Sequence, residues 1–205
     1  MGELVVGTFL TLDGVMQAPG GPDEDRSDGF EHGGWLAPLS DDDLGRTVMA
    51  WMERSKALLL GRRTYEIFAS YWPRFGDENP IAASLNHLPK HVATRTLGRL
   101  EWANSTVLSG EVPEAVAALK ERTDGEIHVH GSGNLVQTLM PHDLIDEYRL
   151  RIAPVVLGSG RRLFADGAVP AGLELVESAT SSTGVIMSTY RRAGEVRYGS
   201  FAGED

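Results

Sequence analysis

The sequence predicts an α/β fold whose sheet is mixed, mostly parallel, with antiparallel strands near the C-terminus. Two observations lead to this fold class. Through most of the chain, short runs rich in Val, Ile and Leu alternate with segments whose apolar residues recur at helical spacing. Near the C-terminal end, strand-like runs instead follow one another with glycines between them. Alternating strands and helices form parallel sheets, and successive hairpins add antiparallel strands.

Length and composition predict a single domain over residues 1–205. The chain is 41% apolar and 23% charged, as soluble globular proteins are. Its formal charge of −10 argues against nucleic acid or an anionic membrane surface as a partner. It contains no cysteine, which excludes disulfides and thiolate metal sites. Because it shows neither a basic signal-peptide region nor an apolar run of spanning length, we expect a cytoplasmic protein.

The first strand is expected at residues 4–12, where Val, Phe and Thr are frequent, and it ends at Asp13-Gly14. Turn-forming residues make 17–28 a polar loop. Aromatic residues then flank two glycines in the segment 30–35. This segment is either a mobile flap over a flat ligand or a surface loop held by a buried Trp35.

A helix is expected to begin at Asp41-Asp42-Asp43, because carboxylates are stabilised at a helix N-terminus. Such a triplet caps a helix more often than it catalyses a reaction. Apolar residues from Leu44 to Met52 follow at helical spacing and form the buried face. The apolar run 57–60 then predicts a central strand covered on both faces.

Two arginines at the start of the next helix indicate a bound anion. Gly61-Arg62-Arg63-Thr64 follows the central strand, and Tyr65, Phe68 and Trp72 then lie on one helical face. The helix dipole disfavours cations at this end, so an anion there would explain the placement of both arginines.

Two further strand ends have a similar design. A strand near His91 runs into Thr94-Arg95-Thr96. The strand 127–129 runs into Gly131-Ser132-Gly133, and apolar residues from Leu135 onward continue at helical spacing. A glycine turn before a helix directs several backbone N–H groups at one point, which suits a phosphate. Since the ends of parallel strands line one edge of a sheet, three such turns predict a ligand with several phosphates.

The C-terminal part of the chain is expected to consist of strands. Residues 147–152 alternate strictly, with Arg149 and Arg151 on one face. A second glycine turn, Gly158-Ser159-Gly160, precedes two more arginines. Antiparallel strands are then expected at 173–177, 185–191 and 195–201.

In the order of its motifs the chain resembles the dihydrofolate reductase superfamily, and in particular the branch that contains the pyrimidine reductase domain of riboflavin biosynthesis. The motifs are Thr11-Leu12-Asp13-Gly14, Leu60-Gly61-Arg62-Arg63-Thr64-Tyr65, His130-Gly131-Ser132-Gly133-Asn134-Leu135 and Pro154-Val155-Val156-Leu157-Gly158-Ser159-Gly160-Arg161-Arg162-Leu163-Phe164. The last of them is more like the riboflavin branch. The resemblance covers most of the chain and implies a three-layer dihydrofolate-reductase-like fold and an NADPH-dependent reductase.

The resemblance also implies which residues bind the NADPH cofactor. Two turns would hold its diphosphate, namely Gly61, Arg62, Arg63 and Thr64 on one side and Gly131, Ser132, Gly133, Asn134 and Leu135 on the other. The adenosine 2′-phosphate would be held by Thr94, Arg95 and Thr96. Arg95 would favour NADPH over NADH by pairing with this dianion.

The proton donor implied by the riboflavin branch is Asp13, whose pKa we expect a closed aromatic pocket to raise. Asp13 is otherwise a turn former before Gly14. The acid of dihydrofolate reductases would fall near Gly45, so that motif does not match in register. Expected contacts of the heterocyclic substrate are Gly14, Trp35, Tyr65 and Trp72, although Tyr65 and Trp72 fit a core position equally well.

Several alternatives stay open. Dihydrofolate competes with a pyrimidine or related heterocycle as the substrate, and a noncatalytic nucleotide-binding module that dimerises is the rival from another class. His128 and His130 have the spacing of metal ligands, but no third ligand follows at a recognisable spacing, so we predict no metal. The long C-terminal strands allow a homodimer, which the riboflavin branch commonly forms.

Overall fold

The computed structural model describes residues 1–201, so the last four residues of the predicted domain lie outside the described residues. The strands are β1 Glu3–Thr11, β2 Ser55–Gly61, β3 Lys90–Ala93, β4 Ser105–Val107, β5 Glu126–His130, β6 Glu147–Ala153, β7 Leu173–Thr180 and β8 Ile186–Arg192. The helices are α1 Asp42–Arg54, α2 Arg62–Tyr71, α3 Pro80–His87, α4 Val112–Arg122 and α5 Gly133–Leu139. Short 3-10 turns lie at Ser27–Gly29, Ala37–Leu39, Trp72–Arg74 and Met140–His142.

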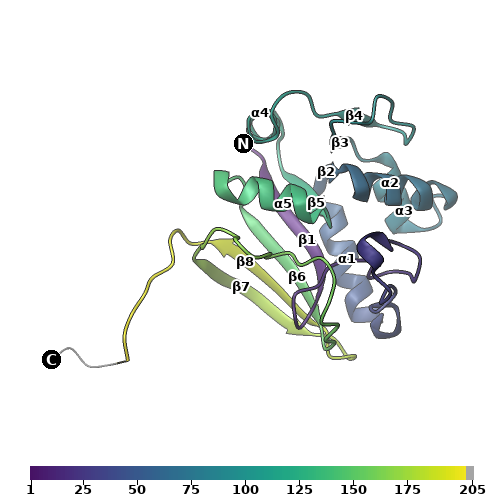
Figure 1. Cartoon of the computed structure of the whole chain (residues 1–205). Helices are drawn as coiled ribbons and strands as arrows, with labels where there is room; N and C mark the ends of the chain where they lie inside the picture. The colour runs from purple at the N-terminus through teal and green to yellow at the C-terminus, as the bar shows by residue number, and fades with distance from the viewer. Residues whose placement is uncertain (202–205) are drawn as a thin grey trace.

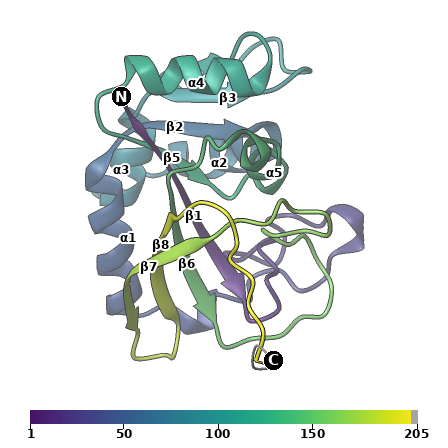
Figure 2. The same cartoon turned by 90° about the vertical axis from the view of Figure 1, so that its left-hand side faces the viewer.

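One sheet of eight strands forms the middle of the molecule, in the order β4-β3-β2-β5-β1-β6-β8-β7 (Figures 1 and 2). The pairs from β4 to β6 are parallel, whereas β8 is antiparallel to both β6 and β7. The predicted mixed sheet with antiparallel C-terminal strands is therefore confirmed.

Helices cover the sheet on both faces, which makes the structure three layers (Figure 1). Neighbouring residues of β2 show the division. Leu59 packs with Val116 of α4 and Val136 of α5. Leu58 and Leu60 point to the opposite face, where they pack with residues of α1, α2 and α3. This alternation is what a central strand buried on both faces requires.

The acidic triplet caps α1, as expected. Asp41 lies in extended conformation before the helix, and its Oδ1 accepts a hydrogen bond from the Leu44 amide at 2.8 Å. Its Oδ2 accepts from the Ser182 hydroxyl at 2.8 Å and from the Thr183 amide at 3.1 Å. The cap therefore also fastens the β7–β8 turn to the start of α1.

Two elements differ from the sequence expectation. The strand predicted at 195–201 is wrong: after Gly194 the chain pairs with no described strand and leaves the sheet (Figure 1). The reason is that Gly172 bonds with Gly194 and Ala193 before β7 begins, which closes the β7–β8 ladder at that point. Helix α3 was not predicted, although Asn79 at its N-cap and Pro80 at its first position are ordinary start signals.

Candidate active site

The three predicted turns lie at the same edge of the sheet, as expected. β2 lies between β3 and β5, and Gly61 at its end is in register with Ala93, directly before the second turn. The first and third turns are joined by hydrogen bonds. The Gly61 amide donates to Ser132 Oγ at 3.0 Å, and the Ser132 amide donates to Thr64 Oγ1 at 3.0 Å.

Ser132 holds an unusual backbone conformation that shapes the third turn. It is left-handed, with φ 54° and ψ 41°, directly after Gly131, which is also left-handed. This conformation costs a non-glycine residue roughly 1 kcal/mol. The two hydrogen bonds of Ser132 offset that cost, so the turn is held in one shape.

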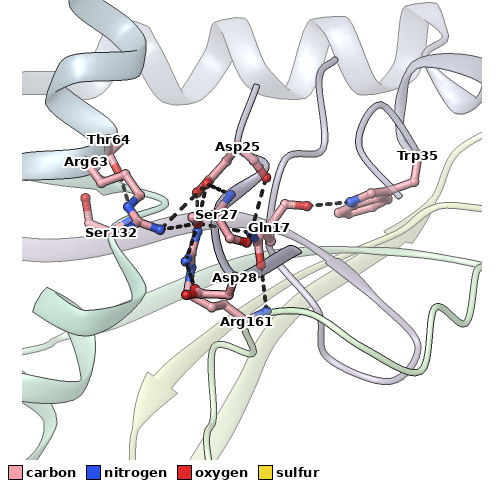
Figure 3. Close-up of polar contacts among 9 residues, drawn as sticks. All are labelled: Gln17, Asp25, Ser27, Asp28, Trp35, Arg63, Thr64, Ser132 and Arg161. Carbon is pink, nitrogen blue, oxygen red and sulfur yellow. Dashed lines mark hydrogen bonds and ion pairs between the residues drawn. The ribbon is translucent and has the colours of Figure 1, made fainter. Parts of the chain in front are cut away.

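The two arginines at the start of α2 have carboxylate partners within the protein. Arg63 lies 3.6 Å from Asp25 and donates to the Ser27 hydroxyl (Figure 3). Arg62 lies 3.8 Å from Glu66, one turn further along the helix. Both arginine side chains remain about half exposed, at 49% and 46%. The placement of these arginines therefore does not depend on a phosphate alone.

The loop 17–28 is tied to both sides of the edge, an arrangement that the sequence did not predict. Arg161 donates to Ser27 Oγ at 2.7 Å and to Asp28 Oδ2 at 2.8 Å, and it also pairs with Asp25 (Figure 3). Gln17 donates to the backbone of Ser27 at 3.1 Å and accepts from the Arg161 amide at 3.1 Å. The sequence features that could have indicated this contact are the acidic residues of the loop and the arginines after the second glycine turn.

Trp35 holds this loop from the inside. Its side chain is buried, and its Nε1 donates to the Gln17 carbonyl at 2.8 Å (Figure 3). The ring packs with Phe30 and Leu44 in one apolar cluster. Of the two interpretations of the segment 30–35, the structure shows the loop held by a buried Trp35.

The expected stacking of Trp35 and Tyr65 on a substrate is corrected by their burial. Trp35 is 8% exposed and Tyr65 only 5%, because the protein itself covers both rings. Tyr65 packs against Trp102, whose amide donates to the Tyr65 hydroxyl at 3.1 Å. Trp72 is half-buried, with Tyr71 edge-on to its ring at 5.0 Å, and its contact with substrate stays a prediction.

Asp13 lies in the turn that follows β1, and its carboxylate is fully hydrogen-bonded. Its carboxylate accepts from Thr11 Oγ1 at 2.6 Å, from the Leu157 amide at 3.2 Å and from the Gly158 amide at 2.8 Å. The Thr11 hydroxyl is the largest cause that lowers the pKa of Asp13, and the Gly158 and Leu157 amides add to it, so that the pKa falls to about 2. The expected rise of this pKa is therefore wrong, since the hydrogen bonds to the ionised form outweigh burial. Gly14, with φ 79°, makes the turn that follows.

The second turn is held by Thr94, whose hydroxyl accepts from the Thr96 amide at 3.2 Å and the Leu97 amide at 3.1 Å. Arg95 and Thr96 are exposed, and Arg95 forms no ion pair with any residue of the described chain. Asn134 is exposed after the third turn, and Leu135 points into the core. In the second turn, Arg95 is therefore available to pair with an anionic ligand.

The two histidines of β5 do not form a metal site with their neighbours. His128 Nε2 lies 2.7 Å from a carboxylate oxygen of Glu126. Within residues 1–201, no group of three or more His, Asp or Glu side chains is placed to hold a metal ion. Nor does any helix in that range combine the length and apolar character needed to cross a membrane.

Comparison with known proteins agrees with the motifs and the fold. Residues 3–187 match the RibD C-terminal domain. This chain belongs to the RibD C-terminal domain family. The RibD-type match spans all three turns, β1 with Asp13, and the second glycine turn, so the resemblance to the riboflavin branch is confirmed.

Relatives of this RibD-type chain include proteins of similar length. The uncharacterized protein YyaP of Bacillus subtilis is 27% identical over 191 residues, which cover 92% of this chain and 94% of YyaP. A putative riboflavin biosynthesis protein from Shewanella sp. PV-4 has a TM-score of 0.71 at 22% identity, over 93% of this chain and 99% of that one. Dihydrofolate reductase from Enterococcus faecalis, solved with NADP(H), has a TM-score of 0.56 at 15% identity, over 93% and 96%. These structures show that the fold is dihydrofolate-reductase-like.

Proposed function

We propose that this RibD-type protein is an NADPH-dependent oxidoreductase that reduces a C=N or C=O bond of a small heterocycle. The observation that carries the proposal is the meeting of three phosphate-type turns at one sheet edge, two of them joined through Ser132. RibD-type reductases of riboflavin biosynthesis act on a pyrimidine, so a pyrimidine-like compound is the first candidate substrate. When bound, NADPH supplies the hydride.

The residues at this edge fit a dinucleotide with three phosphates. Helix α2 begins at Arg62 after the N-cap Gly61, which has no side chain to cap it, so the N–H groups of its first turn have no side-chain acceptor. Gly131 brings its backbone against Thr64, because a Cβ there would lie 3.4 Å from Thr64 Oγ1. We assign the diphosphate to these two turns, with Leu135 contributing only backbone, and the 2′-phosphate to Thr94, Arg95 and Thr96.

Arg63 has to share its charge between Asp25 and a phosphate in this proposal. The Asp25–Arg63 distance of 3.6 Å is that of a loose ion pair, and Arg161 holds Asp25 from the other side. Arg63 can therefore turn toward a phosphate while the loop stays fastened through Arg161.

We assign Asp13 a positioning role in place of proton donation. With its pKa near 2 the carboxylate is ionised at neutral pH and fixes the loop that contains Leu157 and Gly158. Of the four substrate contacts expected from the sequence, we still propose Gly14 and Trp72. The proton that accompanies hydride transfer would then come from solvent.

Calorimetric titration with NADPH and NADH tests the cofactor, and loss of the absorbance of reduced nicotinamide tests the reaction. We expect NADPH to bind at least about tenfold more tightly than NADH. Oxidation of NADPH with dihydrofolate would instead establish the folate alternative. Tight binding without turnover of any heterocycle would establish the noncatalytic module, and no binding of either nucleotide would contradict the proposal.

A homodimer is proposed through the open edge of the sheet. Every residue of β7 is exposed, and Leu173, Leu175 and Val176 are 38%, 52% and 51% exposed. Apolar side chains on an edge strand favour association with a second copy. Light scattering on the purified protein tests this, and a monomeric mass at all concentrations would contradict it.

A further inference from the structure

Two buried arginines on β6 have opposite surroundings. Arg149 and Arg151 are each 1% exposed and lie on the face of the sheet that α1 covers. Arg149 is fully paired: its Nε donates to Glu147 at 2.6 Å, and its two terminal nitrogens donate to the two oxygens of Glu126, each at 2.9 Å. A buried guanidinium normally has such partners.

Arg151 has no such partner among residues 1–201. Its Nε and Nη2 are buried without a hydrogen-bond acceptor, and no described carboxylate forms an ion pair with it. The guanidinium carbon lies 2.9 Å from the centroid of the Trp51 ring and 5.7 Å from that of Phe9. Burial lowers the pKa of Arg151 to about 8, and the nearby Arg149 cation contributes to this. The aromatic rings contact the guanidinium group but carry no negative charge, so its Nε and Nη2 edge has no counter-ion within the described chain.

His130 is a second buried polar group without a partner on the same face. Its Nε2 has no hydrogen-bond partner in the described part of the chain, and its ring lies 6.3 Å from that of Phe68. Burial, with smaller effects of His128 and Arg151, lowers the pKa of His130 to about 3. The imidazole is therefore neutral and able to accept or donate one hydrogen bond.

Both groups lie next to the proposed cofactor edge. His130 directly precedes Gly131 of the third turn. Arg151 is in register with Phe9, and each of these residues is two positions before the end of its strand. Their side chains thus lie just below the edge, on the face opposite α5.

We propose that Arg151 and His130 form a substrate subsite that binds a planar heterocyclic carboxylate. This inference rests on the proposed reductase function and names its substrate class. Nε and Nη2 are the two donors of the side-on edge of a guanidinium, and together they match the two oxygens of one carboxylate. Trp51 and Phe9 supply flat apolar surfaces for the ring, and His130 meets a polar ring atom. Because Nε and Nη2 are buried, the side chains that cover this edge must move before a carboxylate can reach it.

Orotate and uracil provide a matched pair of probes, since they share a pyrimidine ring and differ by one carboxylate. Each is titrated by calorimetry into the wild-type protein and Arg151→Met, with and without NADPH. We expect orotate to bind wild-type protein at least about tenfold more tightly than uracil, and Arg151→Met to lose this preference. Equal or undetectable binding of both probes to wild-type protein, or a preference retained by Arg151→Met, overturns the proposal.

Thermal denaturation separates a binding role from a structural one. Because Arg151 is an unpaired buried cation, Arg151→Met should melt at the same or a higher temperature than wild-type protein. Arg149→Met is the control on the same strand, and it should melt at a lower temperature because it leaves Glu126 and Glu147 without their shared cation. A lowered melting temperature of Arg151→Met would overturn the proposal. NADPH binding, read in the same titrations, tests the reductase function independently of the orotate preference.

Discussion

Arg63 and Arg161 donate to the same Ser27 hydroxyl, although they come from opposite sides of the sheet edge (Figure 3). Asp25 lies between the same two guanidiniums. This small polar cluster fixes the loop 17–28 between the first turn, through Arg63, and the second glycine turn, through Arg161. It also makes the loop sensitive to a change in either partner.

Removing Asp25 should loosen the loop. We expect Asp25→Ala to be cleaved between residues 17 and 35 by a nonspecific protease faster than wild-type protein, because Arg63 loses its ion pair and Arg161 keeps only the one with Asp28. Asp23→Ala is the matched control, since Asp23 is 80% exposed and, within residues 1–201, its one ion pair is with Arg26 of the same loop. Equal cleavage of both variants would contradict the role of Asp25.

Asp13 should stabilise the protein at neutral pH but not in acid. Its pKa is about 2 in the folded protein, against an ordinary value of 3.8. A lowered folded-state pKa contributes stability above pH 3.8, and this contribution is lost as the pH falls toward 2. We expect Asp13→Asn to lower the free energy of unfolding by about 1 kcal/mol at pH 7, a value discounted for solvent screening, and by less near pH 3. Denaturant unfolding at the two pH values measures this, and an equal effect at both would refute it.

Ser132 allows strain and hydrogen bonding to be measured separately. Ser132→Ala loses the hydrogen bond to Gly61 and keeps the left-handed backbone, whereas Ser132→Gly loses the same bond and relieves the strain. We therefore expect the alanine variant to be less stable than the glycine variant by about 1 kcal/mol in denaturant unfolding. Both should bind NADPH more weakly than wild-type protein. Greater stability of the alanine variant would show that the turn is unstrained.

Arg95 should determine the preference between the two nucleotides. We expect Arg95→Gln to weaken NADPH binding about tenfold or more and to leave NADH binding unchanged, because only NADPH has the 2′-phosphate. Arg99→Gln, an exposed arginine a few residues further along, is the control. Parallel loss of both nucleotides in Arg95→Gln would mean that the residue serves the turn and not the phosphate.

The sequence was sufficient for features that depend on local pattern. The fold class and the shared edge of the three turns follow from short apolar runs that end at Gly61, Thr94 and Gly131. Features that depend on distant partners were not accessible. The pKa of Asp13 is lowered partly by the amide of Leu157, 144 residues away, and Asp25 is held by Arg161, 136 residues away.

Aromatic residues illustrate a second limit. Tyr65 and Trp72 lie on the same helical face in the sequence, and helical spacing is identical for a ring in the core and a ring over a ligand. Only the packing of Trp102 against Tyr65 distinguishes the two. The sequence likewise could not show that Arg151 is unpaired. Strict alternation along β6 places Arg149 and Arg151 on the same face, and their different partners come mostly from other elements of the fold.

The hydrogen bond between Gly61 and Ser132 joins residues that are 71 positions apart in the chain. A nascent or partly refolded chain therefore has either turn without the other until β5 docks beside β2. Nucleotide binding would then require this step of folding, and its rate of appearance during refolding would measure when β5 pairs with β2.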